Sequence, residues 1–169
     1  MNDVLRSWHD FYILIGTASA TLVGLTFVAA SIGASIFRER PHGLRAFLSP
    51  TIVYFATVLI ACLIAIVPSN QSPLLGLLVA VTGIAGLIYG GSVWRVMRRH
   101  GFSIDLADRL WYAMLPMVAN LLLGIGGFGL VLQASTGCDL LALGMGLLLI
   151  AGIRNAWDMT VWIIERQAP

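Results

Sequence analysis

The chain has 169 residues, of which 59% are hydrophobic and 11% charged, and its formal net charge is +2. A soluble domain carries about 25% charged residues, and a small domain leaves much of its surface against its solvent. The composition therefore excludes an ordinary water-soluble domain and predicts that lipid surrounds most of the chain. All ten basic residues are arginines spread between apolar runs, a pattern that argues against a nucleic-acid-binding face.

Five apolar stretches are long enough to cross a bilayer, which takes about 20 helical residues. In chain order, we expect membrane-spanning helices at 10–37, 50–67, 74–97, 105–133 and 140–165, packed as one all-α bundle. Pro50 suits the first position of the second helix, where an N–H group has no helical partner. Short turns are expected at Pro68–Pro73 and at Ala134–Asp139.

The arginines predict the orientation of the chain. They occur in the loop after the first helix, around the loop after the third, and in the C-terminal tail, as Arg38, Arg40, Arg45, Arg95, Arg98, Arg99, Arg109 and Arg166. The other two turns have none. Because basic loops stay in the cytoplasm, we expect the N-terminus outside and the C-terminus inside, with Trp8 and Tyr12 at the outer interface.

A candidate polar cluster lies on the fifth helix. Arg154 and Asp158 are four residues apart and therefore share one helical face. Ionisable groups inside a membrane are costly, so they indicate a functional site by default. We expect Asn155, Tyr54 and Asn120 to join this cluster. Two interpretations stay open: a structural ion pair that locks the fifth helix into the bundle, or a site that handles a ligand or ion.

Pro116 lies inside the fourth predicted helix. Because proline has no N–H group, the carbonyl of Tyr112 loses its helical donor. A carbonyl in lipid needs a substitute donor, and Arg154 is the candidate.

The first helix carries a candidate polar stripe of hydroxyl side chains along one side, formed by Thr17, Thr21, Ser31 and Ser35. Such a stripe either lines a water-filled path or bonds to neighbouring helices. Glycines within the helices, such as Gly16 and Gly24, favour close helix packing. That packing serves either the bundle itself or a contact between copies of the chain.

No motif for a cofactor, a metal or catalysis is recognisable. The histidines lie outside the predicted mid-helix positions, which argues against a haem, and a phosphate-binding loop of the usual kind requires a lysine. The two cysteines, Cys62 and Cys138, are expected near the outer side. They form either a disulfide or one packed and one free thiol. We expect no cofactor and no enzymatic activity.

Two segments carry a resemblance to known proteins. The run from Gly16 to Ser31, GTASATLVGLTFVAAS, and the run RNAWD from Arg154 to Asp158 resemble segments of small bacterial inner-membrane proteins without an assigned function. The resemblance covers these two segments well and the middle of the chain loosely. It implies a multi-pass protein of the bacterial inner membrane, and it supplies no activity and no functional residues.

The leading functional hypothesis is a small homo-oligomeric channel or transporter-like protein built around the polar cluster. The alternative is a structural or regulatory subunit of a larger membrane assembly, bound to other membrane proteins and without transport activity. Because five helices do not divide into two equal halves, we expect any pore to be shared between subunits.

Overall fold

The computed structural model describes residues 8–32, 49–68, 72–99 and 110–167, except for the side chains of 72, 96–99, 110, 162, 163 and 165–167. Its regular elements are α2 (His9–Ile32), α5 (Ser49–Ile66), α6 (Ser72–Arg99), η2 (Leu110–Met114), α8 (Leu115–Val131) and α9 (Thr136–Gln167). All regular structure in these ranges is helical, and five helices are long and apolar enough to cross a membrane. The chain is a small polytopic membrane protein of the all-α class.

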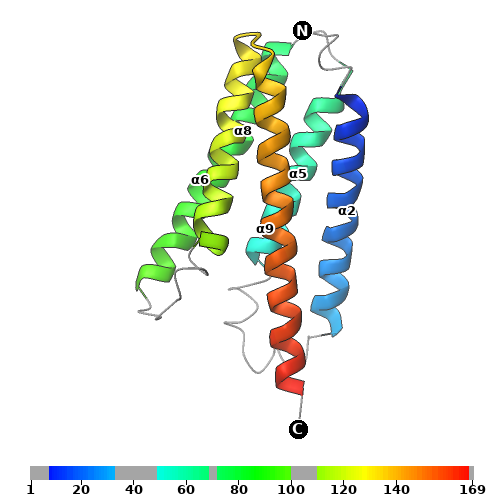
Figure 1. The fold of residues 1–169 in the computed structure, drawn as a ribbon, viewed down its shortest axis with the longest axis vertical. Coiled ribbons are helices and arrows are strands. Elements are labelled where there is room, and N and C mark those ends of the chain that lie inside the picture. Colours follow the sequence, from blue (N-terminus) through cyan, green and yellow to red (C-terminus); the bar gives the residue numbers. More distant parts are fainter. Residues whose placement is uncertain (1–7, 33–48, 69–71, 100–109, 168–169) are drawn as a thin grey trace.

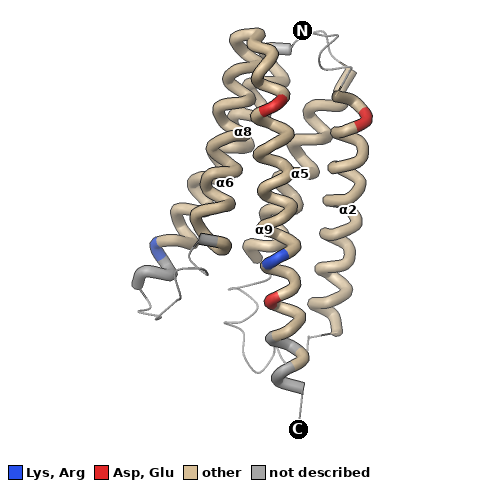
Figure 2. Tube along the Cα trace, in the orientation of Figure 1, with Lys and Arg blue, Asp and Glu red and all other residues tan. Residues whose placement is uncertain are grey.

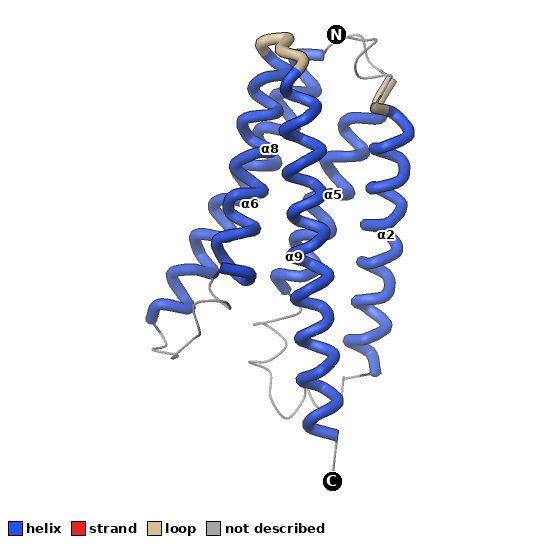
Figure 3. The backbone as a smooth tube through the Cα atoms, viewed as in Figure 1, coloured by secondary structure: helices blue, strands red, loops and turns tan. Residues whose placement is uncertain are grey.

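Helix α9 lies in the middle of the bundle (Figure 1). It packs against α8 and α5, while α6 packs against α8 and α2 against α5. The helices run alternately up and down, so the start of α2 and the end of α9 lie at opposite ends of the bundle (Figure 1). The loop between α8 and α9 is short and lies at the top of the bundle in Figure 3.

The helix boundaries follow the predicted spans, with one correction. Helices α5 and α6 match the predicted spans to within two residues at each end. The turn predicted at Ala134–Asp139 is wrong in its second half, because α9 already begins at Thr136. Gln133 shortens this turn by adopting a left-handed φ of 59°. Asp139 then lies in the first turn of α9, where the helix dipole favours a negative charge. Residues 33–37 and 105–109 of the predicted spans lie outside the described residues.

Large apolar side chains cover the outside of the bundle. Each of the five helices exposes more than half of at least one such side chain, in Leu14, Leu63, Ile88, Phe128 and Trp157. A soluble monomer rarely exposes apolar patches of this extent. This surface is therefore suited to contact with lipid. Because lipid tails are as apolar as these side chains, the hydrophobic effect does not bring the helices together.

The contact between α6 and α8 depends on glycine. A Cβ atom on Gly83 would lie 2.5 Å from the backbone nitrogen of Gly124, and one on Gly127 would lie 2.5 Å from that of Ala80. The two backbones therefore touch, and these glycines serve packing within the chain. Gly24 on α2 is different, since a Cβ atom there would have no neighbour within 4 Å.

Candidate functional site

The charged pair of the polar cluster forms one turn of α9. The Nε atom of Arg154 lies 3.1 Å from Oδ2 of Asp158, at the i, i+4 spacing of a helix. The guanidinium also lies over the ring of Trp111, 5.8 Å from its centroid, where the ring face attracts a cation. The Arg154 side chain is 49% exposed and that of Asp158 is 24% exposed. The pair thus borders the outside of the bundle rather than its core.

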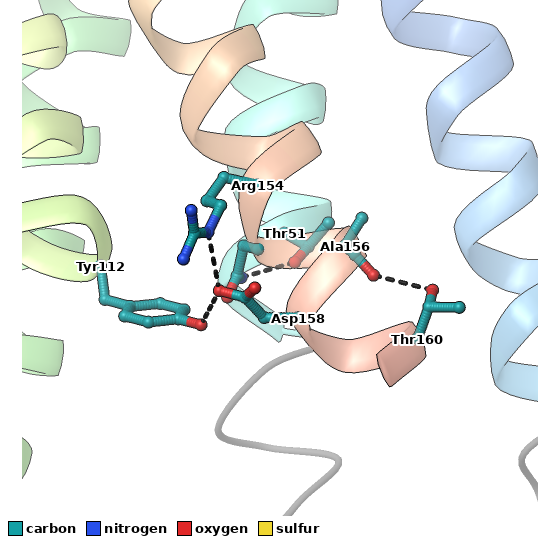
Figure 4. A network of polar contacts seen from close by, with 7 residues as sticks. Thr51, Tyr112, Arg154, Ala156, Asp158 and Thr160 are labelled. Carbon is teal, nitrogen blue, oxygen red and sulfur yellow. Dashed lines mark hydrogen bonds and ion pairs between the residues drawn. The ribbon is translucent and has the colours of Figure 1, made fainter. Parts of the chain in front are cut away.

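The π-helical turn η2 brings Tyr112 to the same carboxylate. The Tyr112 hydroxyl donates a hydrogen bond to Oδ2 of Asp158, the oxygen that Arg154 also contacts (Figure 4). Both groups therefore donate to one oxygen, from two different helical elements. A bond to a charged acceptor is stronger than one between neutral groups, so this contact ties η2 to α9.

The carbonyl that Pro116 leaves without a helical donor is bonded from α5. The Tyr54 hydroxyl donates to the backbone oxygen of Tyr112 at 3.1 Å. The donor to this carbonyl is therefore Tyr54 and not Arg154, which the sequence predicted. The Arg154 side chain lies against Asp158 and Trp111 instead. Tyr112 consequently connects three elements: its hydroxyl reaches α9 and its carbonyl reaches α5.

Asn155 faces the inside of the bundle, opposite to the exposed neighbour Arg154. It is 2% exposed, and its Nδ2 atom donates to the hydroxyl of Thr51 at 2.6 Å. Thr51 itself is fully buried. This bond joins the first turn of α5 to α9, and it lies beside the Asp158 cluster in Figure 4.

Asn120 is placed away from Arg154 and Asp158. Its Nδ2 atom donates to the carbonyl of Pro116 at 2.8 Å within α8. Its side-chain oxygen occupies the space that a side chain at Gly86 would need, on the face of α8 that packs against α6. The structure therefore assembles Arg154, Asp158, Asn155 and Tyr54 around η2 but leaves Asn120 at the α6–α8 contact.

The pair lies close to one edge of the membrane. Arg154 follows the first residue of α9 by 18 positions, a rise of about 27 Å across a hydrocarbon core of about 30 Å. In Figure 2 both blue segments, which mark the described arginines, lie in the lower half of the bundle. A half-exposed guanidinium at this depth suits an anionic lipid headgroup or solute as well as a structural role.

The polar stripe of the first helix faces outward from the bundle. Thr17, Thr21 and Ser31 are exposed, and the buried face of α2, with Tyr12, Gly16 and Ser19, lies on the opposite side. Thr21 and Ser31 donate to the carbonyls four residues earlier in their own helix, at 2.9 Å each. Ser35 lies outside the described residues. Among the residues that the structure describes, the stripe therefore contacts no other helix, and its outward face is left to lipid or to a partner.

The end of the bundle opposite to the charged pair is rich in sulfur. Cys62 and Cys138 are both buried free thiols, so of the two predicted alternatives the disulfide is not formed. Cys138 belongs to the first turn of α9 rather than to a loop. Tyr12 is fully buried beside Cys138. Its predicted place at the outer interface of the membrane concerns its depth and stays a prediction. Within the described residues, no group of three or more histidine, cysteine, aspartate or glutamate side chains is arranged to hold a metal ion.

The sequence predicts that the carbonyl of Tyr112, which stands four residues before Pro116, needs a donor. It does not place the Tyr112 hydroxyl, Thr51 or Trp111 in the cluster. No comparable signal marks Thr51 or Trp111.

Comparison of the chain with protein-family models, curated proteins and solved structures finds no match.

Proposed function

We propose that this chain is the subunit of a homo-oligomeric channel or transporter-like protein of the bacterial inner membrane, in which α2 forms the contact between subunits. One observation carries the proposal: α2 is the least covered helix, with 17% of its apolar window buried against 39–50% in α5, α6, α8 and α9. Its uncovered face is also the face that carries the hydroxyl stripe.

The spacing of the stripe fits a contact between two copies of α2. Thr17, Thr21, Gly24, Val28 and Ser31 are separated by alternating steps of four and three residues. This 3.5-residue period keeps one seam facing a partner helix that crosses at about 20°. Gly24 is open on this face, and small residues let two backbones approach closely in lipid.

A shared path between subunits is consistent with the interior of the single chain. Large apolar side chains such as Phe55, Leu123, Leu141 and Leu148 are fully buried there. A polar solute would therefore meet apolar packing inside one subunit. Hydroxyl-bearing faces brought together from several subunits provide a more polar route.

The second candidate is a structural or regulatory subunit of a larger membrane assembly. It is favoured by the charged pair, because Asp158 receives bonds from both Arg154 and Tyr112 and acts there as a joint between helices. Under this alternative, the uncovered face of α2 contacts a different protein, and no solute crosses the chain.

The first experiment tests the contact between subunits. A Thr21→Cys variant in native membranes should form a disulfide-linked dimer on mild oxidation, because the stripe of one copy faces that of another. Ile88→Cys is the matched control, since Ile88 is 65% exposed on α6. The native cysteines are buried, so the unmodified chain should stay monomeric on denaturing gels. Equal dimer formation by the two variants would refute the α2 contact.

The second experiment separates transport from scaffolding. The purified oligomer is reconstituted into liposomes, and the flux of small ions is followed with a fluorescent indicator. Flux that Thr21→Leu reduces while the oligomer persists supports the channel. An intact oligomer with no flux, purified together with a stoichiometric membrane partner, supports the scaffold instead.

A further inference from the structure

The charges of Arg154 and Asp158 balance each other, and both side chains are partly exposed. The guanidinium is held at its Nε atom, 3.1 Å from Oδ2 of Asp158. It also lies over the partly exposed ring of Trp111. A cation and an anion are therefore fixed side by side at the outside of the bundle. Two fixed charges of opposite sign are complementary to a ligand that carries one charge of each sign.

The carboxylate of Asp158 has one oxygen to offer such a ligand. Its contacts within the described residues, from Arg154 and from the Tyr112 hydroxyl, are both made to Oδ2 (Figure 4). An ionised carboxylate accepts hydrogen bonds through both oxygens. Because the Asp158 side chain is 24% exposed, Oδ1 is left for a donor that these residues do not supply.

The two charges lie at the depth where lipid headgroups begin. Arg154 comes 18 residues and Asp158 22 residues after Thr136, the first residue of α9, which is a rise of about 27 Å and about 33 Å. The hydrocarbon core is about 30 Å thick. The guanidinium is therefore at the edge of the hydrocarbon, and the carboxylate is on its headgroup side. Trp111 suits the same level, where indole rings are enriched.

We propose that Arg154, Asp158 and Trp111 form a binding site for one zwitterionic phospholipid with a primary ammonium group, of the phosphatidylethanolamine type. The phosphate contacts the guanidinium, the side chain best suited to phosphate oxygens. The ammonium donates a hydrogen bond to Oδ1 of Asp158. The site is independent of the contact between copies of α2 and of any transport by the chain.

The order of the two charges along the membrane normal agrees with this lipid. Its phosphate is attached to the glycerol and lies next to the hydrocarbon, at the level of Arg154. Its ammonium is at the far end of the headgroup, at the level of Asp158. Leu143 and Ile150 are exposed and precede Arg154 by eleven and four residues, so the three share one face of α9. This face gives the acyl chains an apolar path toward the middle of the membrane.

Asp158 also provides selectivity among phospholipids. An anionic lipid such as phosphatidylglycerol has no cation to pair with the carboxylate, and its phosphate would be repelled by it. The quaternary ammonium of phosphatidylcholine carries a positive charge but has no N–H group to donate to Oδ1. Only a primary ammonium supplies both the charge and the hydrogen bond.

The test uses the full chain in micelles of a nonionic detergent. Phosphatidylethanolamine, phosphatidylcholine and phosphatidylglycerol with identical acyl chains are added in turn, and native mass spectrometry measures how many lipids each chain retains and how tightly. We expect one tightly retained phosphatidylethanolamine per chain. Each of the other two lipids should bind about 10-fold more weakly, as expected for the loss of a hydrogen bond to a charged group.

Two variants assign the charges to their partners. Asp158→Asn should abolish the preference for phosphatidylethanolamine over phosphatidylglycerol, because the repelling carboxylate is gone. Arg154→Gln should weaken phosphatidylethanolamine about 10-fold, because the phosphate loses its charged donor. The matched control is Arg95→Gln, which removes an exposed arginine of α6 and should leave the preference unchanged. Thermal unfolding identifies any variant that fails to fold.

The comparison of the three lipids on the unmodified chain needs no variant. Equal retention of phosphatidylethanolamine and phosphatidylcholine would overturn the proposal, and so would tighter retention of phosphatidylglycerol, which would indicate an anionic-lipid site. Displacement of the lipid by an equal concentration of water-soluble glycerophosphoethanolamine would indicate a solute site and would exclude a lipid site. An unchanged lipid preference in folded Asp158→Asn would also contradict the assignment.

Discussion

Tyr112 joins two helices through two different atoms. Its hydroxyl donates to Asp158 on α9, and its backbone oxygen accepts from Tyr54 on α5. Asp158 is therefore held by a neutral donor as well as by Arg154. The cluster thus consists of hydrogen-bonded pairs. Each pairing offsets the free-energy cost of placing an unbonded polar group in lipid.

Replacing Tyr112 with phenylalanine tests this bond alone. We expect Tyr112→Phe to lower the free energy of unfolding by about 1 kcal/mol, a value between those for interhelical bonds in membranes and for bonds to charged groups. Unfolding in mixed micelles with increasing SDS measures the change. Tyr89→Phe on α6 is the control, because within the described residues Tyr89 forms a hydrogen bond through its backbone oxygen and not through its hydroxyl. Equal stability of the two variants would contradict the assigned role of Tyr112.

At the scale of helical elements, α6 and α8 form the closest contact in the bundle. The backbone of α6 at Gly83 touches that of α8 at Gly124, and Gly76 and Gly127 repeat this arrangement nearer the other end. Close approach of this kind lets dispersion forces and weak Cα–H contacts act over the length of both helices. The two helices are thus expected to behave as one unit.

The two glycines that face each other should respond oppositely to an added methyl group. Gly83→Ala places a Cβ atom 2.5 Å from a backbone nitrogen, and we expect a loss of about 2 kcal/mol, as for overpacking. Gly124→Ala meets nothing within 4 Å and should be neutral or slightly stabilising, because alanine favours a helix more than glycine does. Thermal unfolding of both variants in detergent measures their change in stability relative to the unmodified chain. A similar gain in stability in both would show that helix propensity rather than contact governs the pair.

The turn at the start of α8 is a second element-scale feature. The π-helical residues Leu110–Met114 precede Pro116, and a side chain of α5 bonds the carbonyl that the proline leaves free. Irregular backbone in a membrane helix is tolerated where neighbouring groups satisfy it. Here Tyr54 has that function.

A double-mutant cycle between Tyr54 and Pro116 tests this interpretation. Tyr54→Phe alone should cost about 1 kcal/mol or more, because it leaves a buried carbonyl unbonded. The same change in a Pro116→Ala background should cost less, since the alanine N–H at position 116 supplies the donor. The coupling, measured from the four unfolding free energies, should be close to 1 kcal/mol. Additive effects would mean that Tyr54 stabilises the chain by another route.

At the scale of the whole molecule, the alternating helices separate two ends with different chemistry. One end carries Asp10, Asp139 and the buried thiol of Cys138. The other end carries Arg95, Arg154 and Asp158. The start of α2 and the end of α9 lie at opposite ends of the bundle (Figure 1). An odd number of spans requires this separation, and the arginine-bearing loops predict which side is cytoplasmic.

Labelling of single cysteines tests this orientation. Asn70→Cys, in the predicted outer turn, should react in intact cells with a maleimide that cannot cross membranes. Gly101→Cys, in the loop after the third helix, should react only after the cells are opened, because basic loops are retained inside. The buried native cysteines should contribute little background. The reverse pattern would place the N-terminus in the cytoplasm.

The amino-acid sequence by itself determined that the chain lies in a membrane, and it placed all five helices. Partition of a 20-residue apolar stretch into lipid depends on that stretch alone, and prolines such as Pro50 and Pro68 act on helix ends locally. The close spacing of Arg154 and Asp158 also follows from helix geometry. These features require no knowledge of neighbouring helices.

The tertiary structure alone decided which side chains meet. Tyr54 rather than Arg154 bonds the carbonyl freed by Pro116, Asn120 faces α6, and Tyr12 and Cys138 are buried together. Each outcome depends on how far a helix is rotated about its axis and which helix lies beside it. In lipid that choice follows from the packing of small residues and interhelical bonds across the whole bundle, which a single stretch of sequence does not specify.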